Sequence, residues 1–163
     1  MTHANIRNNT IIDFNSLYLD EDITRVETSE ELYNAWLDDK NKVVYQNGKV
    51  ILNPNYEEEQ ANKRQEAFLK DFFKIEGYGY YRRVPKGYQS AVESMNVLFN
   101  IANLTKGLQA GLIIFYEEPD FTDAEQCTEE WLIKHQIIMP AMTLEQFMQL
   151  YVAFMTAWNT TEH

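Results

Sequence analysis

Hydrophobic and polar residues follow one another along the chain with the spacings of short strands and amphipathic helices. Two β-prone runs, Lys42–Gln46 and Lys49–Leu52, flank Asn47 and Gly48. Asn-Gly is the preferred centre of a type I′ turn because both residues must adopt positive φ. The pattern therefore predicts a β-hairpin over 42–52. A short continuous apolar run, Leu112–Tyr116, predicts a buried strand.

The same pattern predicts about five helices. Four begin at a Ser or Thr that is followed three positions later by Glu or Gln, which is the signature of a capping box. The fifth follows Pro54 and has Asn55 as its expected N-cap. The segment that ends near His135 also fits a strand, and the sequence leaves that choice open. The expected helices cover approximately 29–39, 56–74, 90–105, 122–135 and 143–158, with caps at Thr28, Asn55, Ser90, Thr122 and Thr143.

The helix expected over 56–74 has two unlike halves. Tyr56–Glu66 carries few apolar residues, whereas the end near Phe72 and Phe73 is aromatic. We therefore expect the first half to lie in solvent or on a partner and the second half to enter the core.

These elements predict an α+β fold weighted toward helix, with about five helices, a β-hairpin at 42–52 and a short buried strand near 112–116. A chain of 163 residues fits one domain, residues 1–163. Residues 1–9 are polar and are expected to be flexible. Thr10–Leu19 is expected to form a strand.

The composition narrows the class of protein. The hydrophobic content of 45% supports a folded core. The N-terminal residues hold no apolar run behind a basic leader, so no signal peptide is expected. The Leu112–Tyr116 run is far too short to cross a bilayer, so no membrane insertion is expected. The single Cys127 excludes an internal disulfide framework and is read as a small core side chain.

The net charge of −11 is unevenly distributed. Residues 1–39 carry two basic and nine acidic side chains, residues 40–106 eleven basic and seven acidic, and residues 107–163 one basic and nine acidic. Such acidic ends make nucleic acid a poor partner. They could dock on the basic middle, within one chain or between copies, or the charges could simply cover solvated faces.

No pattern points to catalysis, a metal or a cofactor. His3, His135 and His163 are scattered and form no ligand spacing. Adjacent carboxylates such as Glu117 and Glu118 are expected by chance in a chain with 25 acidic residues. The sequence therefore predicts neither an enzyme nor a metal or cofactor site.

The Tyr78–Tyr88 stretch interleaves tyrosines with Arg82, Arg83 and Lys86. Such a stretch could stack on bases or sugars. It could equally pack its rings on the core while the arginines pair with the acidic ends of the chain. The acidic flanks favour the second interpretation. If the stretch is a site, an anionic peptide or a glycan is the expected ligand.

Several segments resemble small uncharacterised accessory proteins encoded among bacteriophage and prophage tail genes. They are NGKVILNPNYEEEQANKRQEAF, GYYRRVPKGYQSAVESMN, FYEEPDFTDAEQCTEEWL and MTLEQFMQLYVAFMTAWN, and together they cover roughly residues 40–160. The resemblance carries no catalytic residues. It implies a viral tail or virion component that works through contacts, located in the host bacterial cytoplasm during assembly, with the finished particle as a second location.

The sequence thus predicts a non-enzymatic structural or tail-assembly protein that binds protein partners or self-associates. The alternative is a small carbohydrate- or peptide-binding module that uses the Tyr78–Tyr88 stretch. The residues expected to make contacts are Glu58, Arg64, Tyr81, Arg82 and Arg83.

Overall fold

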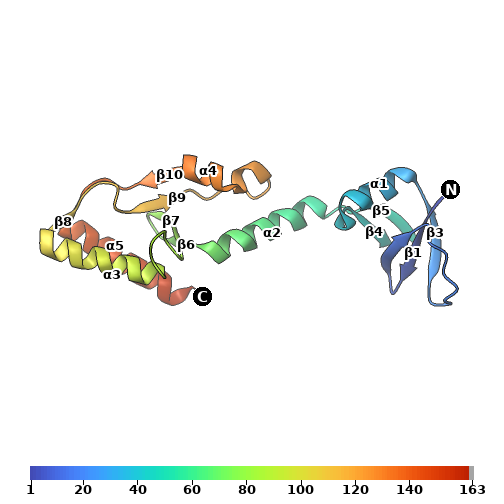
Figure 1. The fold of residues 1–163 in the computed structure, drawn as a ribbon, viewed down its shortest axis with the longest axis horizontal. Coiled ribbons are helices and arrows are strands. Elements are labelled where there is room, and N and C mark those ends of the chain that lie inside the picture. Colours follow the sequence, from blue (N-terminus) through green and yellow to red (C-terminus); the bar gives the residue numbers. More distant parts are fainter. Residues whose placement is uncertain (162–163) are drawn as a thin grey trace. The chain divides into compact units, whose positions relative to one another are not determined.

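A computed structural model describes residues 1–161 and confirms the α+β class, with 43% helix and 26% strand (Figure 1). Contacts between residues divide the chain into two compact units, Met1–Glu59 and Gln60–His163, called here the N-terminal and C-terminal units. The single domain expected from chain length stays a prediction, and each unit is described by itself.

The N-terminal unit consists of one three-stranded sheet, one hairpin and one helix. The sheet has the antiparallel order β2-β1-β3, and β4 pairs with β5. Buried Ala4, Ile6, Phe14, Val43 and Val50 form its core. The bounds are β1 Thr2–Arg7, β2 Thr10–Phe14, β3 Thr24–Thr28, α1 Glu30–Asp38, the 3-10 turn η1 Lys40–Lys42, β4 Val43–Gln46 and β5 Lys49–Leu52.

The prediction that residues 1–9 are flexible is wrong, because Thr2–Arg7 form the central strand of this sheet. Asn8 and Asn9 both take positive φ and close a tight turn to β2. The polar Asn5 is buried because its amide donates to Asp13 Oδ1 at 2.8 Å and to the Ser16 carbonyl at 2.9 Å. A buried polar side chain with satisfied bonds is hidden from a hydrophobicity pattern.

The hairpin at 42–52 is confirmed, and Asn47 and Gly48 have φ values of 54° and 77°. The helix after it in the prediction order, α1, begins one residue later than expected. Ser29 rather than Thr28 is the N-cap, and its Oγ accepts from the Leu32 amide at 3.2 Å.

The C-terminal unit contains a four-stranded sheet of order β10-β9-β7-β6 and a small two-stranded pair, β8 with β11. The helix α2 (Tyr56–Asp71) begins before the boundary between the units and ends within this one. The other bounds are β6 Phe72–Ile75, β7 Gly79–Arg82, α3 Ala91–Thr105, β8 Gly107–Leu108, β9 Ile114–Tyr116, the 3-10 turn η2 Ala124–Cys127, α4 Glu129–Lys134, β10 Gln136–Ile138, β11 Met142–Thr143 and α5 Leu144–Thr160.

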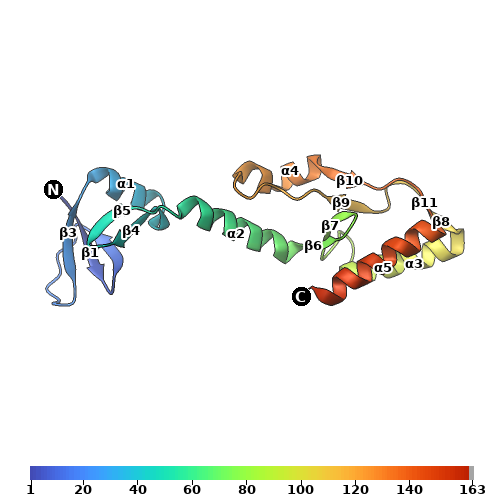
Figure 2. The ribbon, with the colours of Figure 1, turned by 180° about the vertical axis from the view of Figure 1, so that it is seen from behind.

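The four-stranded sheet is buried on both faces, because successive side chains of a strand point to opposite sides. Phe73, Tyr81 and Phe115 join the main core with α3 and α5, which lie side by side in Figures 1 and 2. Their neighbours Phe72, Tyr80 and Tyr116 join a second cluster with Phe68 at the end of α2 and Leu132 of α4. The sheet is therefore the middle layer of this unit.

Two helix predictions in this unit need correction. The helix expected over 56–74 ends at Asp71, and its aromatic end is the strand β6, because pairing with β7 buries Phe72 and Phe73 on opposite faces. The segment 122–135 forms the turn η2 and the short α4. Asp123 and Thr128 cap these, and Thr122 does not.

The other predictions in this unit hold. The strand expected near 112–116 is β9, and Ser90 caps α3. Thr143 forms a complete capping box with Gln146 at the start of α5.

Candidate binding groove beside strand β6

A large open groove with a volume of about 1150 Å³ lies beside β6 and is called here the β6 groove. The end of α2 and the C-terminal half of α5 contribute its walls, and β6 lies between them in the lining. Its apolar lining includes Leu69, Phe72, Phe73, Val84 and Trp158. The volume exceeds the roughly 300–1,000 Å³ of typical small-ligand pockets. A segment of chain therefore fits it better than a small molecule does.

The groove is open because α5 presents small side chains to it. Ala153, Thr156, Ala157 and Thr160 recur at the i, i+3, i+4 and i+7 spacing of one helix face, and all line the groove. The large residues Phe147, Leu150 and Phe154 of the same helix lie fully buried in the main core. One helix thus fills the core with one face and leaves space with another.

The strand β6 is the last strand of its sheet, so its outer edge carries no neighbouring strand among residues 1–161. The Arg83 amide donates to the Asp71 carbonyl at 2.9 Å, which fixes the alternation of the ladder. In an antiparallel pair, Phe73 and Ile75 then face β7, whereas the backbone N–H and C=O of Lys74 face outward. An open strand edge is a template for pairing with another chain.

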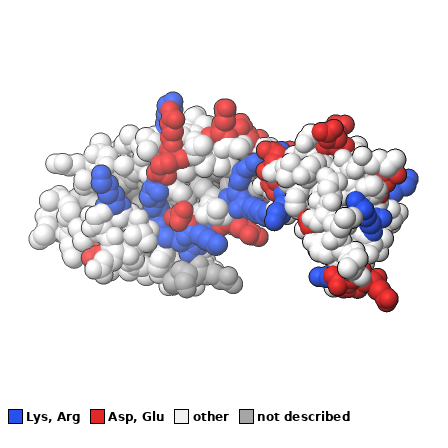
Figure 3. All heavy atoms as spheres, turned by 45° about the vertical axis from the view of Figure 1, so that its right-hand side comes forward, with Lys and Arg blue, Asp and Glu red and all other residues white. Residues whose placement is uncertain are grey.

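The rim of the groove is charged, with more cations than carboxylates. Lys70, Lys74 and Arg83 line it together with Glu66 and Glu76. Lys74 Nζ lies 3.9 Å from Glu76 Oε1, which makes a loose surface pair. Figure 3 shows Lys and Arg side chains gathered in the middle of the drawn face, with Asp and Glu side chains among them.

Arg83 is held in position at this rim. Its Nε donates to the Leu69 carbonyl at 3.0 Å, near the C-terminal end of α2, where a cation is favoured by the helix dipole. Its guanidinium lies 5.9 Å from the centre of the Phe73 ring. Arg83 therefore joins the wall of the groove to its floor.

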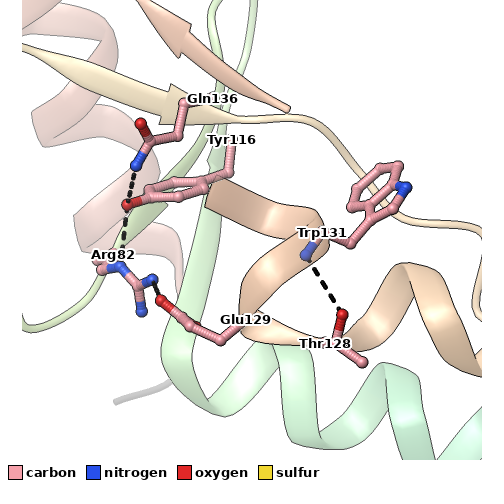
Figure 4. Close-up of polar contacts among 6 residues, drawn as sticks. All are labelled: Arg82, Tyr116, Thr128, Glu129, Trp131 and Gln136. Atoms are coloured by element: carbon pink, nitrogen blue, oxygen red, sulfur yellow. Dashed lines mark hydrogen bonds and ion pairs between the residues drawn. The ribbon is translucent and has the colours of Figure 1, made fainter. Parts of the chain in front are cut away.

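The neighbouring Arg82 lies in a closed cluster (Figure 4). Its guanidinium lies 4.8 Å from the Phe72 ring centre and 4.9 Å from that of Tyr116, and it pairs with Glu129 of α4. Its Nε donates to Tyr116 Oη at 3.1 Å, and Gln136 Nε2 donates to the same oxygen at 3.3 Å. Burial disfavours the charged form, but Tyr116 and Glu129 outweigh it and raise the pKa of Arg82.

The tyrosines of the Tyr78–Tyr88 stretch serve mainly as core. Tyr80 and Tyr81 are buried, and Tyr78 stacks on Phe115 with ring centres 5.7 Å apart. Tyr81 Oη and Ser94 Oγ share a hydrogen bond of 2.5 Å, and burial raises the pKa of Tyr81. The rings pack on the core and Arg82 pairs with an acidic residue of the C-terminal segment, as the second interpretation of the stretch has it.

The predicted contact residues are not gathered in one place. Of those in the C-terminal unit, Arg83 alone lines the β6 groove, whereas Arg64 Nη1 donates to the Phe121 carbonyl at 2.9 Å. Glu58 is exposed and belongs to the N-terminal unit. Sequence reasoning missed Leu69 and the small face of α5. The i, i+3, i+4, i+7 recurrence of Ala and Thr was the signal that could have indicated the latter.

Searches against family models, curated proteins and solved structures found no match for this chain. Among residues 1–161, three or more His, Cys, Asp and Glu side chains nowhere converge as a metal site. Within the same part of the chain, no helix combines the length and the apolar character that crossing a membrane requires.

Proposed function

We propose that this chain is a non-enzymatic phage-type structural or tail-assembly protein that acts through protein–protein contacts, and that the β6 groove is its contact surface. The observation that carries the proposal is the combination of an apolar groove, a cationic rim and an open strand edge at one place.

A protein segment is the occupant that uses all three features. An extended peptide adds a strand to an open sheet edge through main-chain hydrogen bonds and places alternate side chains in adjoining pockets. The apolar lining supplies such a pocket through Leu69, Phe73 and Trp158, and Lys70 and Lys74 favour an acidic segment. Val84 at the rim is 62% exposed, which adds to the apolar surface that a partner would cover.

The test is a variant that obstructs the groove without touching the core. Thr156 is exposed on α5 and lines the groove, so Thr156→Glu adds both bulk and a negative charge there. The matched control is Asn159→Glu, on the same helix, exposed and outside the lining. Circular dichroism verifies that both variants fold.

The readout is particle size by light scattering over a range of protein concentrations at low and high salt. We expect assemblies of the parent protein and of Asn159→Glu to grow with concentration, whereas Thr156→Glu stays smaller. Co-purification with proteins encoded beside its gene, lost in Thr156→Glu, covers a different partner. A strict monomer under all conditions, with no co-purifying neighbour, would contradict the proposal.

A second candidate function is a carbohydrate- or peptide-binding module. It is favoured by a cavity of about 220 Å³ whose lining includes Arg82, Lys86 and Tyr88. A ligand bound only by the folded state raises the melting temperature. A glycan screen by thermal shift tests this, and a hit should lose its effect in Lys86→Ala and Tyr88→Ala. A hit that survives both substitutions places the ligand elsewhere.

A further inference from the structure

We infer that the occupant of the β6 groove is the loop Leu17–Asp22 of a second copy of this chain. The inference rests on the proposed function, because it names the partner of the same groove.

The loop presents two leucines to solvent. Leu17 is 81% exposed and Leu19 is fully exposed, whereas Tyr18 between them turns back and donates to Asp13 Oδ2 at 2.6 Å. This alternation is the one that an extended strand shows. Two exposed leucines on one side of an extended segment form a ready anchor for an apolar groove.

The loop is also held in position by polar contacts. The Asn5 amide donates to the Ser16 carbonyl at 2.9 Å, which fixes the start of the loop. Arg7 pairs with Asp20 at 3.4 Å and with Asp22 at 2.9 Å, which fixes its end. A loop that is already ordered loses less conformational entropy when it binds.

The apolar and backbone features of the two surfaces match. Leu17 and Leu19 would enter the lining that contains Leu69 and Trp158. Within residues 1–161, no backbone hydrogen bond involves Leu17, Tyr18 or Leu19. Their free N–H and C=O groups can pair with those of Lys74 on the outer edge of β6.

The charges match as well. Asp20, Glu21 and Asp22 follow the leucines directly, and Lys70 and Lys74 stand on the rim of the groove. Within the described chain Glu21 has no ion-pair partner, so its charge is available to a lysine of the other copy.

The contact is heterologous, because the loop of one copy enters the groove of the next. Each docked pair leaves one loop and one groove unused, so copies add head to tail into a ring or an open chain. A loop of six residues buries less than the roughly 1,200 Å² of a stable interface, so we expect a dissociation constant on the order of tens of micromolar.

The decisive experiment mixes two variants. The loop variant Leu17→Ser/Leu19→Ser keeps its groove, and the groove variant Thr156→Glu keeps its loop. Each alone should be monomeric at 200 μM, a concentration of about ten times the expected dissociation constant. A mixture in equal amounts should form a dimer and nothing larger, because it contains a single pair of intact surfaces. Leu37→Ser, exposed in the same unit as the loop, is the matched control and should assemble like the parent protein.

The outcomes separate the inference from the proposed function. If the loop variant assembles like the parent protein while the groove variant does not, the groove is the contact surface but another segment fills it. If the mixture of the two variants stays monomeric, the loop-in-groove contact is overturned. A fluorescent peptide of residues 14–23 that binds the parent protein and not Thr156→Glu supports it independently. The peptide's affinity should fall when salt is raised from 0.15 M to about 1 M, where the Debye length shortens from about 8 to 3 Å.

Discussion

Arg82 and Arg83 are adjacent in the sequence, yet they lie in opposite kinds of environment. Arg82 lies between two aromatic rings, bonds to Tyr116 and pairs with Glu129 of α4. Arg83 lines the β6 groove, where its Nε bonds to the Leu69 carbonyl. The first arginine belongs to a closed cluster, and the second to an open surface.

The difference teaches what converts a basic and aromatic stretch into structure or into a contact surface. Both environments contain phenylalanine rings and carboxylates. On the side of Arg82, α4 supplies Glu129 and covers the rings together with Leu132. On the side of the groove, α5 presents small residues such as Ala157 and leaves the rings of β6 accessible. The covering helix, rather than the stretch itself, decides the outcome.

The largest expected effect comes from emptying the closed cluster. Tyr116→Ala should lower the free energy of unfolding by about 3–5 kcal/mol, as large-to-small substitutions of buried aromatic residues do. The ring is buried against Phe72, and its hydroxyl accepts from Arg82 and Gln136. Urea denaturation followed by tryptophan fluorescence measures the loss.

The matched substitution in the groove is Leu69→Ala. Leu69 is 39% exposed, so this change should cost about 1 kcal/mol or less. Equal losses in the two variants would show that the groove is as well packed as the cluster and would end the comparison.

A second prediction concerns Tyr81, which lies in the main core beneath both environments. Tyr81→Phe removes the partner of Ser94, which is itself 1% exposed. An unsatisfied buried hydroxyl costs about 1–3 kcal/mol. We therefore expect a loss of this size at pH 8, measured by urea denaturation. Ser94→Ala combined with Tyr81→Phe should recover part of it, because no buried hydroxyl is then left alone.

The same tyrosine gives a pH dependence whose sign is fixed. Burial raises the pKa of Tyr81 above its ordinary value of 10.0, so the folded protein keeps the proton that the unfolded chain releases. Its contribution to stability is complete below pH 10 and is lost as the pH rises through the folded pKa. The parent protein should therefore lose stability above pH 10 more steeply than Tyr81→Phe. Parallel slopes would contradict the assignment.

Much of the fold could be predicted because its signals are local. The hairpin at 42–52 follows from the turn preference of Asn47 and Gly48, and the start of α5 follows from Thr143 and Gln146. The aromatic end of α2 could not be assigned correctly, because Phe72 and Phe73 suit a helix or a strand equally. Pairing with β7, a non-local contact, decides for the strand.

The site was less accessible from the sequence for the same reason. The alternation within β6 and β7 separates neighbours such as Tyr80 and Tyr81 onto opposite faces, and a list of tyrosines and arginines does not show which face is covered. The groove depends on the spacing of Ala153 and Ala157 relative to a strand some 80 positions earlier. No local pattern carries that relation.

A third prediction returns to the adjacent arginines. Arg82→Ala should cost about 1–2 kcal/mol, because it removes a hydrogen bond to Tyr116 and ring contacts with Tyr116 and Phe72. Arg83→Ala should cost less, about 1 kcal/mol, and should weaken assembly instead. Chemical denaturation and light scattering on the same two variants measure both properties. A reversed order, with Arg83→Ala the less stable variant, would contradict the division into closed and open environments.

The smallest expected effect isolates the ion pair that closes the cluster. Glu129→Gln keeps the shape of the side chain but removes its charge opposite Arg82. Because Glu129 is more than half exposed, the loss should be about 0.2–1 kcal/mol and should shrink as salt is raised. Glu130→Gln is the matched control, since its pair with Lys134 is more exposed on both sides and should contribute about 0.3–0.5 kcal/mol at most. A loss in Glu129→Gln that persists undiminished in 1 M salt would show that the rings, and not the covering charge of α4, hold Arg82 in place.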